Sequence, residues 1–175
     1  GEISQLNLKE PGRVTASFNV AAMLEPTPVE WTEKIRNSRL DAKPYWHIER
    51  SRIGNSRKVP VEVVVNGESV AKREVVADGS MKHMEFDIDI EKSSWVAVRI
   101  VPSAHTNPIF IEVDGRPIRA SRRSAEWCIE AVDTCWESKK GQIEDRDTEA
   151  AKLAYDQAKE IYRKILAETE TVLLR

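Results

Sequence analysis

The feature that most constrains this chain is a strict alternation of apolar and polar residues in its middle. Over residues 84–90 the apolar side chains fall at every second position: Met84, Phe86, Ile88 and Ile90. Side chains of a β-strand alternate between two faces, so this run predicts a strand with one face in a core and one in water. Residues 14–20 show the same alternation, whereas residues 95–101 are more uniformly apolar, which is typical of a central strand. The core must therefore be built largely from sheets.

Two dipeptides predict tight hairpin turns. Asn66-Gly67 separates strands expected at 61–65 and 69–76, and Asp114-Gly115 separates strands expected at 109–113 and 116–118. Both dipeptides supply the positive φ angles that a two-residue turn requires. Pro117 has no N–H to donate, so the strand at 116–118 should be short and at an edge. With further strands expected at 3–8 and 45–50, the count is about eight. The predicted fold is mainly β with α: an antiparallel β-sandwich of immunoglobulin or jelly-roll type over residues 1–120, followed by helices.

After Ala120 the apolar period becomes helical. Ser121 and Ser124 are candidate N-caps of a first helix that ends at Gly141, and Asp145 or Asp147 can cap a second. The second helix carries an apolar stripe: Ala151, Ala154, Ala158, Ile161, Tyr162 and Ile165. We therefore expect residues 121–175 to form a helical hairpin packed on the sandwich, the two parts making one structural domain.

The two cysteines of the chain, Cys128 and Cys135, fall on the first predicted helix. Seven helical residues separate them by about 10.5 Å, too far for a disulfide. We expect buried thiols on one helical face.

Composition excludes some classes of partner. The 175 residues carry 27 Lys and Arg against 29 Asp and Glu, and this balance argues against general nucleic-acid binding. No apolar stretch approaches the roughly 20 residues that span a bilayer, so no membrane partner is expected. The first residues lack an initiator Met and a targeting signal, which favours a processed or excised piece of a larger protein.

The sequence contains no complete catalytic motif. The three histidines, His47, His83 and His105, lack metal-ligand spacing, and neither a nucleophile motif nor a glycine-rich phosphate loop is present. We expect His47 and Glu49 on one strand face, as a partly exposed histidine beside a solvated carboxylate. Asp87 and Asp89 should likewise lie on a solvated face. No cofactor or metal is therefore expected in this chain.

Three groups of residues are candidates for binding. The first is four cations within eight residues at the start of the predicted hairpin: Arg116, Arg119, Arg122 and Arg123. Cations at a helix N-terminus are unfavourable unless paired, so they either pair with local acids such as Glu112, Glu126 or Glu130, or meet an anion or an acidic partner. A second basic group, Arg50, Arg52, Arg57 and Lys58, is expected to lie nearby. The second group of candidates is His105 and Asn107 in the polar loop 103–108, because binding residues collect in such loops.

The third group is aromatic: Trp31, Tyr45 and Trp46. These rings belong either to the core or to a sugar-stacking platform. Trp31 lies in residues 24–44, a stretch without regular pattern, and a loop of that length is usually functional or contains an unrecognised element.

Several runs together resemble a known family. They are KPYWHIER at 43–50, RKVPVEV at 57–63, SSWVAVRI at 93–100, SAHTNPIF at 103–110, PIRASRRSAEWC at 117–128 and the closing helix at 155–167. These runs are similar to the C-terminal region of bacterial CehA/McbA-type metallohydrolases of the polymerase-and-histidinol-phosphatase (PHP) superfamily. The resemblance implies an upstream metal-binding barrel with His and Asp ligands, a divalent metal in that barrel, and export to the periplasm or beyond. None of its metal motifs occurs in this chain, so no catalytic residue is carried over.

Three hypotheses about function follow. The first is a non-catalytic accessory domain that docks on, or shapes the substrate entrance of, the upstream catalytic domain of the same polypeptide, through the arginine group and the loop 103–108. The second is an independent module that binds a carbohydrate, or an anionic ligand, with the three aromatic rings as the stacking surface. The third, an enzyme in its own right, needs a metal site or catalytic triad that the sequence does not offer.

Overall fold

The computed structural model describes residues 4–173, with side chains up to residue 169. The chain divides into two compact units, residues 1–118 and 119–175, which we call the β unit and the helical unit. Each is described by itself. The predicted packing of the helical hairpin on the sheets stays a prediction.

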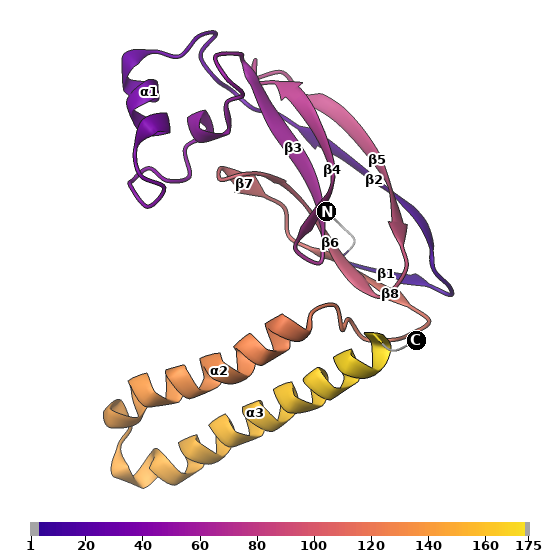
Figure 1. Ribbon diagram of the computed structural model, residues 1–175, viewed down its shortest axis with the longest axis vertical. Helices are drawn as coiled ribbons and strands as arrows, with labels where there is room; N and C mark the ends of the chain where they lie inside the picture. The colour runs from indigo at the N-terminus through magenta and orange to yellow at the C-terminus, as the bar shows by residue number, and fades with distance from the viewer. Residues whose placement is uncertain (1–3, 174–175) are drawn as a thin grey trace. The chain divides into compact units, whose positions relative to one another are not determined.

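Among its described residues, the β unit contains eight strands in two sheets (Figure 1). The larger sheet has the order β1 (Gln5–Leu8), β8 (Ile109–Val113), β6 (Ser94–Ile100), β3 (Lys58–Val65) and β4 (Glu68–Val76), with β7 (Ala104–His105) also paired to β6. The smaller sheet pairs β2 (Gly12–Val20) with β5 (Lys82–Ile90) in antiparallel register. All the strands predicted from alternation and from the Asn66-Gly67 turn are confirmed within the described residues, which begin after Ile3.

The two sheets share one hydrophobic cluster. Val59, Val61 and Val63 of β3 are fully buried, and the cluster also contains the inward side chains of β5, the strand with the clearest alternation. The structure is therefore mixed α and β, with a six-stranded mixed sheet, a two-stranded sheet and two C-terminal helices packed together, and no closed sandwich is seen in the described residues. The prediction that all strands pair antiparallel was wrong at one place, because β1 runs parallel to β8.

Two predicted strands are absent. Residues 116–118 do not form a strand after the Asp114-Gly115 turn. The reason is that β8 already has neighbours on both edges, β6 and β1, and the backbone N–H of Asp114 donates to the carbonyl of Leu8 at 2.8 Å. The predicted strand at 45–50 is instead a 3-10 helix, η1 (Ile48–Ser51), in which the His47 imidazole accepts a hydrogen bond from the Glu49 N–H at 3.1 Å.

The stretch without regular pattern contains a helix, α1 (Glu30–Asn37). Its first turn carries Glu30 and Glu33 and its last turn Lys34 and Arg36, the charge order that favours a helix dipole. The buried Thr32 hydroxyl donates to the carbonyl of Val29 at 3.0 Å and accepts from its N–H at 3.1 Å. This helix is short and mostly exposed, which explains why apolar periodicity did not reveal it.

The helical unit consists of α2 (Arg122–Lys139), a 3-10 turn η2 (Lys140–Gln142) and α3 (Asp145–Leu173). Ser121 is the N-cap of α2, since its hydroxyl accepts from the Ser124 N–H at 3.1 Å, which confirms one of the two candidates. Both cysteines are free, but Cys128 is half-buried and Cys135 exposed, so the expectation of two buried thiols was wrong. No helix in the described part of the chain is long and apolar enough to cross a membrane.

Candidate functional site

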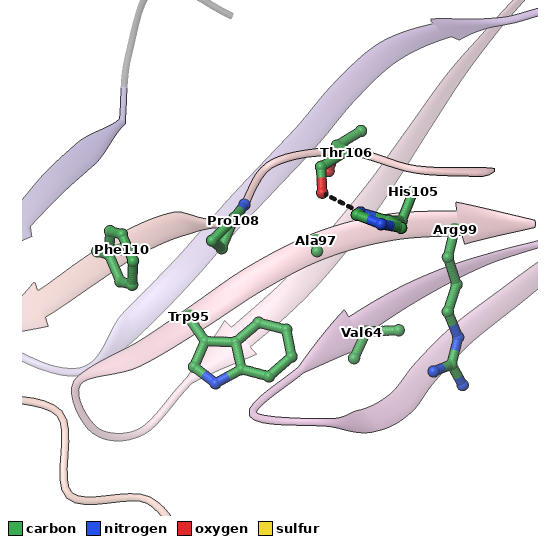
Figure 2. A pocket seen from close by; sticks show the side chains of 8 residues that line it. All are labelled: Val64, Trp95, Ala97, Arg99, His105, Thr106, Pro108 and Phe110. Atoms are coloured by element: carbon green, nitrogen blue, oxygen red, sulfur yellow. Dashed lines mark hydrogen bonds between the residues drawn. The ribbon is translucent and has the colours of Figure 1, made fainter. Parts of the chain in front are cut away.

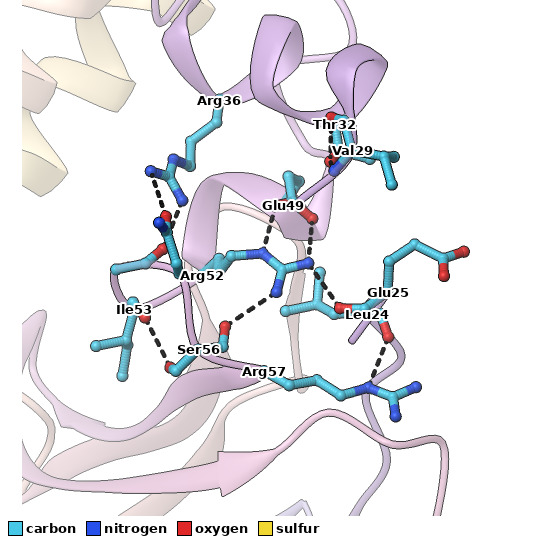
Figure 3. Close-up of polar contacts among 12 residues, drawn as sticks. Leu24, Glu25, Val29, Thr32, Arg36, Glu49, Arg52, Ile53, Ser56 and Arg57 are labelled. Carbon is cyan, nitrogen blue, oxygen red and sulfur yellow. Dashed lines mark hydrogen bonds and ion pairs between the residues drawn. The ribbon is translucent and has the colours of Figure 1, made fainter. Parts of the chain in front are cut away.

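Between β2 and β3 the chain makes a long excursion, residues 24–57, which arginines hold in place (Figure 3). The side chains of Arg52 and Glu49 are 0% and 1% exposed and form a two-point ion pair. Arg52 also donates to the carbonyl oxygens of Ser56 at 3.0 Å and Glu25 at 2.9 Å. Glu49 is therefore not a solvated carboxylate, and the prediction that placed it on an exposed strand face was wrong.

A second arginine fixes residues 38–42, which we call the tip of the excursion. Arg50 donates to the carbonyls of Ser38 at 3.3 Å, Arg39 at 2.9 Å and Ala42 at 3.1 Å, and to the Ser38 hydroxyl at 2.8 Å. A planar guanidinium that holds several carbonyls at once restricts the backbone between them. Leu40, which lies within residues 38–42, is nevertheless 87% exposed. The excursion therefore presents an apolar side chain to solvent on a restrained backbone.

Two further arginines of the excursion also bind backbone. Arg36 donates to the carbonyl of Gly54 at 2.5 Å, and Arg57 to that of Leu24 at 2.8 Å (Figure 3). The second basic group of the sequence is thus largely structural. Its arginines donate hydrogen bonds to backbone carbonyls of the excursion, so these donors are not available to an anion.

The three predicted aromatic residues all belong to the excursion and lie at its surface. Trp31, Tyr45 and Trp46 are 58%, 50% and 49% exposed, so they are not core residues. Tyr45 and Trp46 meet edge to face, with ring centroids 4.7 Å apart and planes at 89°, and Trp31 meets His47 at 5.8 Å and 82°. The rings are rigidly arranged but do not form one flat platform.

A pocket of about 430 Å³ lies on the outward face of the larger sheet, which we call the sheet-face pocket (Figure 2). Its lining comes from β3, β6, β7, β8 and the segment between β7 and β8: Val64, Trp95, Ala97, Arg99, His105, Thr106, Pro108 and Phe110. His105 is the one predicted contact residue that lines it; Asn107 is exposed but is not part of the lining. Sequence reasoning missed Trp95, Ala97 and Arg99, although their positions at every second residue of an expected strand placed them together on one face.

The predicted arginine group divides between the two units. Arg116 belongs to the β unit and pairs with Asp114 at 3.2 Å. In the helical unit Arg119 pairs with Glu168 at 2.5 Å and Arg122 with Glu126 at 2.8 Å, while Arg123 is exposed. Carboxylates therefore pair with three of these cations, and of the acids expected from the sequence only Glu126 is among them.

A second pocket, of about 370 Å³, lies between α2 and α3. Its lining is mostly apolar and includes both cysteines: Trp127, Cys128, Ala131, Val132, Cys135, Ala154, Tyr155, Ala158 and Tyr162. The Tyr155 hydroxyl lies 3.4 Å from the Cys135 sulfur, and this contact raises the pKa of the tyrosine.

Carboxylates outside these pockets have clear local partners. Asp87 and Asp89 are exposed on the outer face of the smaller sheet, as predicted, where Asp87 accepts from Thr15 at 2.7 Å. Arg13, at 2.9 Å, lowers the pKa of Asp89 through a hydrogen bond and its charge. Among the described residues, no group of three or more His, Cys, Asp or Glu side chains could hold a metal ion.

Comparisons of the chain with protein-family models, with curated proteins and with solved structures found no match.

Proposed function

We propose that this chain is a non-catalytic accessory domain of a larger, exported PHP-like metallohydrolase, and that it docks on the catalytic domain of the same polypeptide. The divalent metal and the hydrolytic residues would belong to that upstream domain. In this proposal the two sheets act as a β-sandwich scaffold of immunoglobulin or jelly-roll type around their shared hydrophobic cluster. The resemblance of most of residues 10–168 to such C-terminal regions supports the class of parent protein.

One observation carries the docking proposal: the excursion holds exposed apolar side chains on a restrained backbone. Leu40 and Trp31 are 87% and 58% exposed while Arg50 and Arg52 fix the backbone around them. A loop that is already ordered loses little conformational entropy on binding, and buried aromatic and aliphatic anchors contribute most of the energy of protein interfaces. An apolar contact surface of this kind fits a protein partner.

The test uses the full polypeptide with its upstream domain. Leu40→Asp combined with Trp31→Ser should loosen the contact, which hydrogen exchange would report as faster exchange in both domains and limited proteolysis as earlier cleavage between them. The matched control is Arg122→Glu with Arg123→Glu, which changes charge at the start of α2 and leaves the excursion intact. If only the arginine variant loosens the domains, docking runs through the helical unit; if neither does, the docking proposal is wrong.

A second candidate function is carbohydrate binding through Trp31, Tyr45 and Trp46. The exposure of all three rings, between 49% and 58%, favours it, because sugar rings stack on exposed aromatic faces. The perpendicular arrangement of Tyr45 and Trp46 limits stacking to one ring face at a time. Binding of the unaltered chain to a glycan array, lost in the folded Trp46→Ala variant, would favour this function over docking. An array to which the unaltered chain does not bind would exclude it.

A further inference from the structure

The lining of the sheet-face pocket is ordered by the register of the sheet. On β6, Val96 and Ile100 are core residues with 7% and 6% exposure and Val98 packs against the same core, so the alternate residues of the strand face outward. Trp95, Ala97 and Arg99 are therefore three successive outward positions of one strand.

Each of these positions has a partner directly across the sheet. Trp95 lies opposite Phe110 of β8, Ala97 opposite Val64 of β3, and Arg99 opposite His105 of β7. The pocket thus has an aromatic pair at one end, a pair of small residues in the middle, and Arg99 with His105 at the other end. Figure 2 shows Ala97 between these two ends.

The hollow exists because the middle rung is small. Ala97 carries a single methyl group between large neighbours on both sides, and Thr106 and Pro108 of the crossing segment line the pocket as well. That segment is held down by two hydrogen bonds to Val98: the Thr106 N–H donates to its carbonyl at 2.9 Å, and the Thr106 hydroxyl accepts from its N–H at 3.1 Å. The pocket is therefore formed before any ligand arrives.

The Arg99 guanidinium has spare hydrogen-bond donors. The Nε–H of Arg99 donates to a Glu62 carboxylate oxygen at 2.9 Å, which fixes the guanidinium. None of the hydrogen bonds found among the described residues involves its two terminal amino groups. The His105 Nδ1–H donates to its neighbour's carbonyl, that of Thr106, at 3.1 Å, so Nε2 of the neutral ring is a hydrogen-bond acceptor.

We infer that the sheet-face pocket binds a small aromatic carboxylate, a function beyond the docking proposed above. The aromatic ring would lie over Ala97 against Trp95 and Phe110, and the carboxylate would meet the terminal amino groups of Arg99, because a guanidinium fork matches a carboxylate. The volume of about 430 Å³ falls in the range of small-molecule sites. The mostly apolar lining disfavours a sugar, whose hydroxyl groups would lack hydrogen-bond partners there.

The experiment titrates the whole chain with indole-3-acetate and with its neutral counterpart, indole-3-acetamide. We expect saturable binding of the acid, with a Kd below about 1 mM in calorimetry, and binding of the amide weaker by about tenfold or more. In ¹H–¹⁵N spectra the Trp95 indole N–H should shift with the same midpoint. Equal affinity for acid and amide, or no saturable binding of the acid, would overturn the inference.

Two variants locate the site. Ala97→Leu fills the hollow and should weaken acid binding by about tenfold or more, whereas Ala21→Leu, at an exposed alanine outside the pocket, should leave it unchanged. Unchanged binding by folded Ala97→Leu would place the ligand elsewhere and contradict the inference. Glu62→Gln with Arg99→Gln, which removes the ion pair as a unit, should bring the acid to the affinity of the amide. If Ala97→Leu does not fold, this charge variant decides alone, and retained preference for the acid contradicts the inference.

Discussion

At the scale of single residues, the ion pair of Glu49 with Arg52 is the most consequential contact of the β unit. Both side chains are at most 1% exposed, so the two charges depend on each other and on the backbone carbonyls that Arg52 also binds. Removal of one partner from a buried pair leaves an uncompensated buried charge, which costs far more than the loss of a surface pair.

We therefore expect Glu49→Gln to lower the free energy of unfolding by about 3–5 kcal/mol, measured by urea denaturation. The control is Glu74→Gln, which breaks the exposed pair with Lys58 and should cost at most about 1 kcal/mol. Similar losses in the two variants would show that the Glu49–Arg52 pair is not needed to hold the excursion.

Asp78 gives a prediction about pH. The hydroxyl and backbone N–H of Ser80, followed by the charge of Lys82, lower the pKa of Asp78 to about 2. Because the folded pKa lies below the ordinary value, the ionised form stabilises the folded state above about pH 4, and this contribution disappears as the pH falls toward 2. An NMR titration of the Asp78 carboxyl should show the low pKa, and Ser80→Ala should raise it. A midpoint that Ser80→Ala does not move would contradict this assignment.

At the scale of elements, two similar turn dipeptides had different outcomes. Asn66-Gly67 forms the β3–β4 hairpin, with φ of 52° and 97°, and the Asn66 side chain also accepts from the Trp95 N–H at 3.1 Å. Asp114-Gly115 has φ of 55° and 64° but starts no hairpin, because β1 already occupies the free edge of β8. Local residues predicted both turns. Whether a hairpin follows the second turn depended on β1, a strand about 100 residues away in the sequence that occupies the edge of β8. No local sequence pattern indicates that pairing.

The same distinction applies to the candidate sites. The expected strand at 95–101 implies that Trp95, Ala97 and Arg99 share a face, but finding the pocket required knowledge of which strands lie beside β6. For the excursion, sequence alone identified the aromatic residues and the arginines. It could not reveal that Arg50 and Arg52 bind backbone carbonyls inside the excursion, since these contacts join positions up to 27 residues apart.

The restraint on the excursion tip is testable in hydrogen exchange. Arg50→Met removes the hydrogen bonds from Arg50 to residues 38–42, so the Ala42 amide, which donates to Arg39, should exchange about tenfold faster or more, since hydrogen bonds to charged groups contribute about 1.5–3 kcal/mol each. Exchange in β3 should not change. An unaffected Ala42 amide would mean that α1 and η1 hold the tip without Arg50.

At the scale of the whole molecule, the two units differ in how much apolar surface they bury. The β unit contains the shared cluster of both sheets, whereas Ala125 is the single fully buried apolar side chain among those described in the helical unit. Large apolar side chains of that unit, such as Trp127 at 66% and Ile161 at 58%, are exposed. Helix propensity alone rarely stabilises helices in water, because most of their stability comes from packing an apolar face.

Separate fragments should therefore behave differently. We expect residues 1–118 to unfold cooperatively on heating, and residues 119–175 to show low helicity and no cooperative transition in far-UV circular dichroism, because so few of its side chains are buried. Addition of the first fragment to the second tests whether the β unit supplies the missing packing, since helicity should then rise with concentration. A cooperative transition in residues 119–175 alone at micromolar concentration would contradict the expectation. If that transition depended on concentration, the hairpin would be stabilised by a second copy of itself.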